Sequence, residues 1–259
     1  MICKICSSKI SLVKSFYKPL HKEKIFCSKE KFIKKIFKCL NCDHHYINSF
    51  DYRKSSFIYK YYYDNLAYGN LKNKFHLVQS LKKNKSSNFF RKNFILKNFK
   101  QSKKKKLLDF GSGFGIFPFS IKNNYNVFFY EKNKNCITFS KNYLKLNFFN
   151  IKSKEAKNTF DYITCNKVLE HMSILDIKKY LNMFKKILKK SGKLYLELPD
   201  AAASKKGYHR QEFFSEHINI FSMKSLIIFI KRCGFEVIKI KSLIEVNNKY
   251  TIRIVLKKT

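Results

Sequence analysis

The chain has 259 residues, enough for one large domain and a small one, and its 45% hydrophobic content excludes a globally disordered protein. The formal net charge of +38 first suggests nucleic acid or an anionic membrane as a partner. However, only five of the 55 basic residues are arginine, and lysine, asparagine, isoleucine, phenylalanine and tyrosine abound, as A/T-rich codons would produce. We therefore interpret most lysines as a solvated surface and do not favour nucleic acid as the partner.

No stretch of the sequence approaches the ~20 apolar residues that a membrane-spanning helix needs. The first residues also lack the apolar core of a secretory signal. We expect a cytoplasmic protein with no membrane span, whose eight cysteines remain reduced. The sequence does not indicate the oligomeric state.

Residues 1–50 predict a small module with a structural zinc ion. Two C-x-x-C pairs, whose spacing suits a closed tetrahedral site, are formed by Cys3, Cys6, Cys39 and Cys42. The 32 residues between the pairs exceed the usual zinc-ribbon spacing, and a hairpin insertion would absorb them. Cys27 is a spare thiol in this interpretation, and His44 or His45 could replace one ligand. The alternative is a set of small buried thiols.

Residues 51–106 predict a linker or lid. The tyrosine-rich stretch at 51–68 would either cover an acceptor site or pack between two modules. Residues 70–100 show helical spacing of apolar side chains, from Leu71 to Leu81. The charged run QSKKKK at 101–106 indicates a surface lead-in, so we place a domain boundary near residue 106 and a third unit at 107–259.

From residue 107 onward, short apolar strands alternate with helical patterns. We expect strands at 107–110, 126–130, 148–151, 161–165, 193–197, 235–243 and 250–256, with helices at 136–146, after 165 to about 190, and at 222–233. This alternation predicts an α/β fold whose mostly parallel sheet is covered on both faces. The last two strands flank a short Asn247-Asn248 turn and should pair antiparallel.

The strongest predicted site is LLDFGSGFG at residues 107–115. Glycines and acids are rare in this chain, so local chemistry explains their clustering better than codon bias. A predicted strand runs into three glycines and a helix follows, a context in which the backbone approaches a ligand closely. Glu131 follows the second strand, where nucleotide-binding folds place an acid for ribose hydroxyls. The loop matches neither the dinucleotide nor the Walker pattern. The alternative is a tight turn with a surface glutamate.

These motifs resemble those of class I S-adenosylmethionine (SAM)-dependent methyltransferases. Further similar segments are FDYITCNKVLEHM at 160–172, LKKSGKLYLELPD at 188–200 and the E-H-x-x-x-F-S…G-F pattern within 216–240. The resemblance covers 107–259 and implies an enzyme that uses SAM, with a Rossmann-like seven-stranded sheet whose last strand is antiparallel.

The resemblance also implies which residues bind SAM. They are Asp109, Gly111, Ser112, Gly113, Gly115, Glu131 and Asn166. The glycine loop would face the methionine and ribose parts, and Asp109 would orient the loop or the cofactor's amino group. Glu131 would bind the ribose hydroxyls, and Asn166 would line the methyl-transfer end. In that family the adenine pocket usually follows the third strand, and the short, lysine-rich segment at 151–160 does not indicate which residues would form it.

Methyl transfer chiefly requires alignment of acceptor and methyl group and exclusion of water, because the sulfonium is already activated. A general base helps when the acceptor is a hydroxyl or an acidic carbon. The candidates are His171, His209, Glu216 and His217. His171 has a structural alternative, as a histidine that caps a helix turn, and His209 would lie with Tyr208 on a loop over the site.

The layout of a C-x-x-C module before such a domain is similar to bacterial sugar-modifying methyltransferases, including C-methyltransferases of nucleotide-linked deoxysugars. Those C-methyltransferases tend to carry H-E-H where this chain has Ser215-Glu216-His217, which argues against C-methylation and leaves O-methylation open. No [DN]-P-P-[YF] motif follows the fourth strand, which lowers the odds of amine methylation. We expect a small acceptor, a saccharide or nucleotide sugar. The alternatives are an RNA or protein acceptor, and a non-catalytic binding module.

Overall fold

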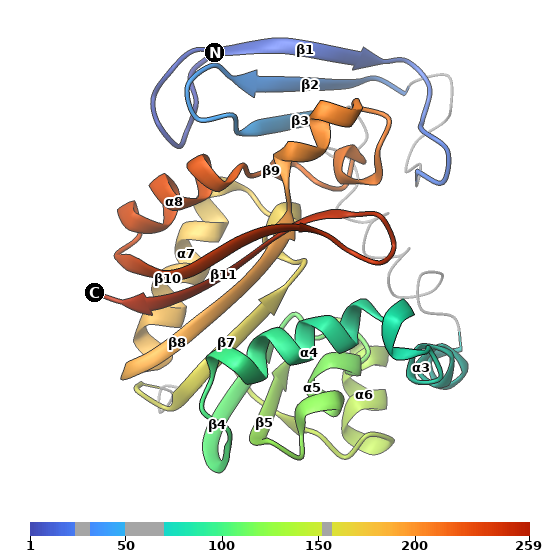
Figure 1. Cartoon of the computed structure of the whole chain (residues 1–259), viewed down its shortest axis with the longest axis vertical. Helices are drawn as coiled ribbons and strands as arrows, with labels where there is room; N and C mark the ends of the chain where they lie inside the picture. The colour runs from blue at the N-terminus through green and yellow to red at the C-terminus, as the bar shows by residue number, and fades with distance from the viewer. Residues whose placement is uncertain (24–31, 50–69, 152–156) are drawn as a thin grey trace.

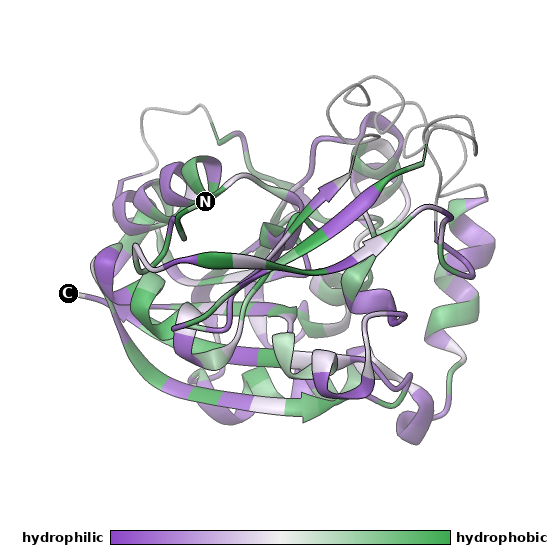
Figure 2. Ribbon diagram, turned by 90° about the horizontal axis from the view of Figure 1, so that it is seen from above, coloured by the Kyte–Doolittle hydropathy of each residue, from purple (hydrophilic) through white to green (hydrophobic). Residues whose placement is uncertain are grey.

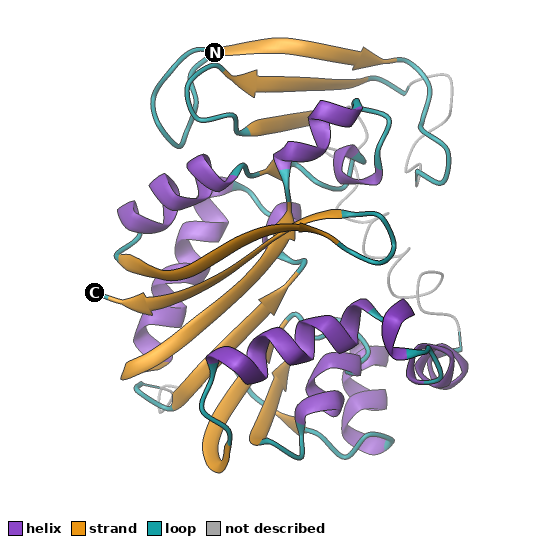
Figure 3. Ribbon diagram, viewed as in Figure 1, coloured by secondary structure: helices purple, strands orange, loops and turns teal. Residues whose placement is uncertain are grey.

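The computed structural model describes residues 1–23, 32–49, 70–151 and 157–259. A small antiparallel sheet lies over one end of a larger sheet that carries helices on both faces (Figures 1 and 3). Cys27, the predicted spare thiol, lies outside the described residues, as does the tyrosine-rich stretch at 51–68, which we predicted to be either a lid or packing between two modules.

The large sheet has seven strands in the order β10-β11-β8-β7-β4-β5-β6. Their bounds are Ser102–Phe110 (β4), Tyr125–Tyr130 (β5), Asn147–Phe148 (β6), Phe160–Asn166 (β7), Leu188–Pro199 (β8), Phe235–Ile244 (β10) and Tyr250–Lys258 (β11). Strands β4 to β8 pair in parallel, and β11 is antiparallel to both of its neighbours. The predicted α/β fold with an antiparallel last strand is confirmed.

The helices cover the two faces of this sheet. They are Leu71–Gln79 (α3), Ser87–Asn98 (α4), Ile116–Ile121 (α5), Lys134–Asn142 (α6), Ile174–Ile187 (α7) and Met223–Arg232 (α8). Side chains alternate across β4, so Leu107 packs in one cluster with α4 and α5, and Leu108 packs in another with α7 and α8. Ser222 caps the start of α8, and Gly234, at φ +72°, follows its end.

Strand β4 begins five residues earlier than expected, within the lysine run. Lys105 forms an ion pair with Asp161 of β7 at 2.9 Å, and the backbone N–H of Lys106 donates to the same carboxylate. Lys189 also pairs with Asp161. Asp161 on the neighbouring strand therefore holds the lysine run in the sheet. From its composition alone, we had interpreted this run as a surface lead-in.

The small sheet has the order β1-β2-β3-β9, so its fourth strand comes from a segment far along the chain from the other three. Its strands are Ile10–Phe16 (β1), Lys34–Cys39 (β2), His45–Ser49 (β3) and Asn219–Ile220 (β9). A buried ion pair of 2.8 Å joins Lys34 to Glu23, and the backbone N–H and hydroxyl of Ser215 both donate to Glu23. The pairing of β9 with β3 and the packing of α4 against the large sheet both join segments that we expected to belong to different units. The expected division into residues 1–50, 51–106 and 107–259 stays a prediction.

Hydrophilic and hydrophobic residues alternate along the outer elements, as expected when one face packs inward (Figure 2). Within the described part of the chain, no helix combines the length and apolarity needed to cross a membrane.

Candidate active site

The glycine loop joins β4 to α5 at the carboxyl end of the sheet. The backbone N–H groups of Gly111 and Ser112 both donate to the carbonyl oxygen of Tyr130, at 2.8 and 3.1 Å. Gly111 has φ +71°, and a Cβ there would lie 2.5 Å from Cγ2 of Val168. Only glycine fits this position without moving the β7 loop, so the backbone lies open to a ligand.

Gly115 serves the loop in a different way. It precedes α5 at φ +80°, and a Cβ there would lie 2.7 Å from Oγ of Ser140 on α6. Gly115 does not line the cavity described below. Its position indicates that it allows α5 and α6 to pack closely.

Asp109 is the second-last residue of β4 and is only 1% exposed. It accepts hydrogen bonds from the Thr164 hydroxyl at 2.7 Å and from Nδ2 of Asn166 at 2.8 Å. Burial raises the pKa of Asp109 to about 7, although both donors oppose the shift. A bound cationic group beside Asp109 would favour its charged form.

Glu131 lies directly after β5, beside the glycine loop. One of its carboxylate oxygens accepts from the backbone N–H of Gly113 at 2.8 Å, and the other accepts from those of Lys132 and Asn133. The acid is therefore held in a fixed orientation at the loop. The predicted contact with ribose hydroxyls remains a prediction.

A cavity of about 490 Å³ opens above the glycine loop. Of the seven residues predicted to bind the cofactor, five line it: Asp109, Gly111, Ser112, Gly113 and Asn166. Oγ of Ser112 and Oδ1 of Asn166 are buried without a hydrogen-bond partner among the described residues. Such orphaned polar atoms fit a ligand with its own donors and acceptors, as the amino and carboxylate groups of SAM would supply.

A second cavity of about 310 Å³ adjoins the first. The residues that line both are Ser87, Arg91, Lys167 and Asn247. His171, Glu216 and His217, three of the predicted catalytic residues, line the second cavity. The structure therefore brings the two predicted sites side by side.

Hydrogen bonds to carbonyl oxygens orient the two histidines of the second cavity. Nδ1 of His171 lies 2.8 Å from the carbonyl oxygen of Glu216, and Nδ1 of His217 lies 3.0 Å from that of Glu212. A carbonyl oxygen only accepts, so the Nδ1 atom of each ring carries a proton. The ring centroids are 5.0 Å apart. Burial lowers the pKa of His217 well below its usual value, which keeps that ring neutral.

His209, the fourth predicted catalytic residue, lies elsewhere. Its exposed ring packs edge-on against Phe16 of the small sheet, with centroids 5.1 Å apart. The hydroxyl of the neighbouring Tyr208 lies 3.3 Å from Nε2 of His45. His209 lines neither cavity, so the structure does not bring it to the other three.

Several polar residues of the second cavity were not identified from the sequence. They are Arg91, Lys167, Glu170, Glu212, Glu245 and Lys249. The signal available in the sequence was the rarity of acidic residues, because four of the chain's 17 acids line this one cavity. Two of the five arginines also meet beside it: Arg91 and Arg253 both donate to Glu197.

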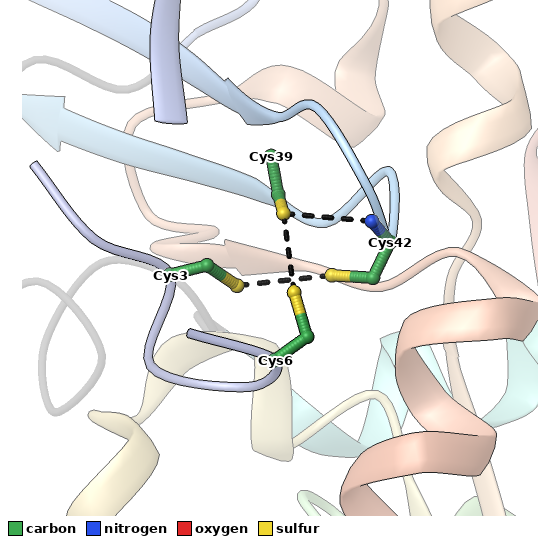
Figure 4. Close-up of side chains that lie close together, drawn as sticks. All are labelled: Cys3, Cys6, Cys39 and Cys42. Atoms are coloured by element: carbon green, nitrogen blue, oxygen red, sulfur yellow. Dashed lines mark hydrogen bonds between the residues drawn. The ribbon is translucent and has the colours of Figure 1, made fainter. Parts of the chain in front are cut away.

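The four predicted cysteine ligands come together at the base of the small sheet, with their side chains directed toward one centre (Figure 4). Their sulfur atoms all lie within 4.8 Å of one another, and two pairs are 3.7 and 3.4 Å apart. Four sulfurs bound to a tetrahedral zinc ion lie about 3.8 Å apart, so this donor set fits such a metal. His44 and His45 bond to other groups and are not in the cluster.

Comparison with known proteins identifies a family and a relative that match this chain. A family model described as a methyltransferase domain matches residues 85–240. An uncharacterized protein of Methanocaldococcus jannaschii is 29% identical over 147 residues, which span 56% of this chain and 60% of that protein.

Solved structures share the fold. A SAM-dependent methyltransferase of Leishmania major has a TM-score of 0.58 at 16% identity, covering 80% of this chain and 82% of its own. One from Methanosarcina mazei has a TM-score of 0.52 at 18% identity, covering 63% and 96%. Together with the glycine loop and the buried acid at the end of β4, the family match identifies the chain: it belongs to the methyltransferase-domain family and is a class I SAM-dependent methyltransferase.

Proposed function

We propose that this enzyme transfers the methyl group of SAM to a hydroxyl of a small polyhydroxyl acceptor, a saccharide or a nucleotide sugar. The observation that carries the proposal is the second cavity, which adjoins the predicted cofactor cavity and contains Glu170, His171, Glu216 and His217. Its volume of about 310 Å³ is at the small end of ligand pockets and suits a sugar ring.

The charge of the cavity favours a neutral, hydroxyl-bearing group at the reacting end. Four glutamates and two histidines line it. Carboxylates and imidazoles accept hydrogen bonds from hydroxyls. Arg91, Lys167 and Lys249 also line the cavity and would suit the diphosphate of a nucleotide sugar.

The transfer is a single displacement. The acceptor oxygen attacks the methyl carbon, the carbon–sulfur bond breaks with its electron pair going to sulfur, and S-adenosylhomocysteine leaves. The hydroxyl proton passes to a base of the cavity, for which Glu216 and His217 are the candidates. Neutral His217 has an Nε2 lone pair for this role.

The test is transfer of a labelled methyl group from SAM to a panel of saccharides and nucleotide sugars, with RNA and protein substrates in parallel. We expect label in a sugar, at least about 100-fold less turnover for His217→Gln, and unchanged turnover for His21→Gln, an exposed histidine of the small module. SAM binding that His217→Gln leaves intact would assign the loss to the acceptor side. Label only in RNA or protein would overturn the proposal.

An RNA or protein acceptor remains the second candidate because of the net charge of +38. The same panel tests it, and salt dependence adds a second readout. A macromolecular acceptor held by lysines would lose affinity steeply as ionic strength rises, whereas a sugar in the cavity would not.

We also propose that the four-cysteine cluster holds a structural zinc ion. The sulfur spacing supports this, as do the backbone N–H groups of Ile5 and Cys42, which lie 3.4 and 3.5 Å from the sulfurs of Cys3 and Cys39. Thiolate ligands need a reducing compartment, which supports the predicted cytoplasmic location. Elemental analysis of the purified protein should find one zinc per chain.

A further inference from the structure

The second cavity contains a donor group that methyl transfer alone does not explain. Glu170, His171 and His217 each offer one ligand atom, and these atoms all lie within 4.8 Å of one another. The first two belong to the loop after β7, and His217 lies just before β9. Two segments distant in sequence therefore converge on one point.

Glu170 is the first sign of a missing partner. Its side chain lines the cavity, the residue is 1% exposed, and neither carboxylate oxygen has a hydrogen-bond partner among the described residues. Nearby acids differ in this respect: Glu245 pairs with Lys167 at 3.0 Å, and Glu212 pairs with Arg210 at 3.3 Å. A buried carboxylate without a partner is costly, so a ligand or a proton is expected at Glu170.

The histidines supply the second, independent sign. Both donate from Nδ1 to a backbone carbonyl oxygen, so Nε2 is the atom of each ring that could serve as a metal ligand. This is how proteins orient imidazoles that bind a metal ion through Nε2.

We propose that Glu170, His171 and His217 bind a divalent transition-metal ion in the acceptor cavity. Two imidazoles and a carboxylate suit Mn²⁺, Co²⁺ or Zn²⁺ better than Mg²⁺, which prefers oxygen ligands. The proposal rests on the proposed function for its role. The ion would bind the acceptor hydroxyl and lower its pKa, so that the alkoxide oxygen attacks the methyl carbon. The displaced proton then goes to Glu216, because the imidazoles serve as ligands.

Cobalt titration of the full-length, zinc-filled protein tests the site without any acceptor. We expect one Co²⁺ per chain, with visible absorption bands of nitrogen and oxygen ligands and no thiolate charge-transfer band, which would mark exchange into the cysteine cluster. Glu170→Gln and His217→Gln should each weaken Co²⁺ binding by at least about 100-fold. Glu236→Gln, on the exposed face of β10, should bind as the wild type does.

Each outcome decides the proposal. No Co²⁺ uptake by the wild type, uptake only with thiolate bands, or uptake unchanged in His217→Gln would overturn it. If Glu170→Gln does not fold, the wild-type spectrum and His217→Gln still decide. SAM binding is measured on the same samples: protein that binds SAM but no Co²⁺ refutes only the metal site, whereas a sample that binds Co²⁺ but methylates no sugar refutes only the proposed acceptor.

Discussion

At the scale of single residues, Asp109 links the protonation of the protein to cofactor binding. With a pKa near 7, its buried carboxyl is mostly protonated at about pH 6. The amino group of SAM, if it lies beside Asp109 as predicted, would favour the carboxylate. We therefore expect SAM binding at about pH 6 to release close to one proton, and affinity to rise between about pH 6 and 8. Calorimetry in buffers of different ionisation enthalpy measures this release.

Two variants test whether Asp109 is the group that releases the proton. Asp109→Asn should abolish the release, whereas Asp176→Asn, which changes an exposed acid at the start of α7, should leave it intact. Equal release from Asp109→Asn would assign the proton to another group. The same raised pKa makes the stability of the fold depend on pH. Asp109 favours the folded state below about pH 4, and this contribution to the free energy of unfolding is lost as the pH rises through about 7.

At the scale of elements, Glu197 of β8 connects a helix and a second strand. Arg91 of α4 and Arg253 of β11 both donate to its fully buried carboxylate, at 3.1 and 3.0 Å. Burial alone would raise the pKa of Glu197, but the nearby positive charges, led by Arg91, lower it to about 2. Glu197→Gln should therefore lower the free energy of unfolding by about 3 kcal/mol in urea titrations.

The matched control is an exposed ion pair on the same sheet. Glu236 and Lys257 lie 3.0 Å apart, with their side chains about half exposed. Glu236→Gln should cost less than about 1 kcal/mol, since water screens the pair. Equal losses from the two variants would show that the arginines gain nothing from burial.

How much the sequence could predict also differs between elements. Strands and helices after residue 107 have clear apolar periodicity, so the sheet, the glycine loop and the antiparallel β11 were predictable. Strand β9 was not, because Asn219–Ile220 is a strand only through its pairing with β3. Lys167, Glu170 and Glu245 were missed for the same reason: tertiary packing alone brings them into one cavity.

At the scale of the whole molecule, the cysteine cluster belongs to the main core. Cys3, Cys39 and Cys42 pack in one hydrophobic cluster with Leu226 and Phe229 of α8. Loss of the proposed zinc ion should therefore destabilise the whole protein and not only its first 50 residues. We expect Cys39→Ser to lower the free energy of unfolding by at least about 4 kcal/mol, or about 10 °C in Tm, within one calorimetric transition.

A cysteine outside the cluster provides the comparison. Cys233→Ser, at the end of the same helix α8, removes a buried thiol without touching the cluster and should shift the Tm by only a few degrees. Two separate transitions in Cys39→Ser would mean that the small sheet unfolds independently.

The late position of β9 in the sequence has a consequence for synthesis on the ribosome. Strand β3 finds its outer neighbour only when residues 219–220 have emerged, long after the cysteines have been made. Until then β3 is a bare edge whose N–H and C=O groups can pair with another nascent chain. The small sheet is thus completed only after most of the large sheet has been made, and cells that make this protein rapidly should benefit from chaperones that shield the β2–β3 hairpin.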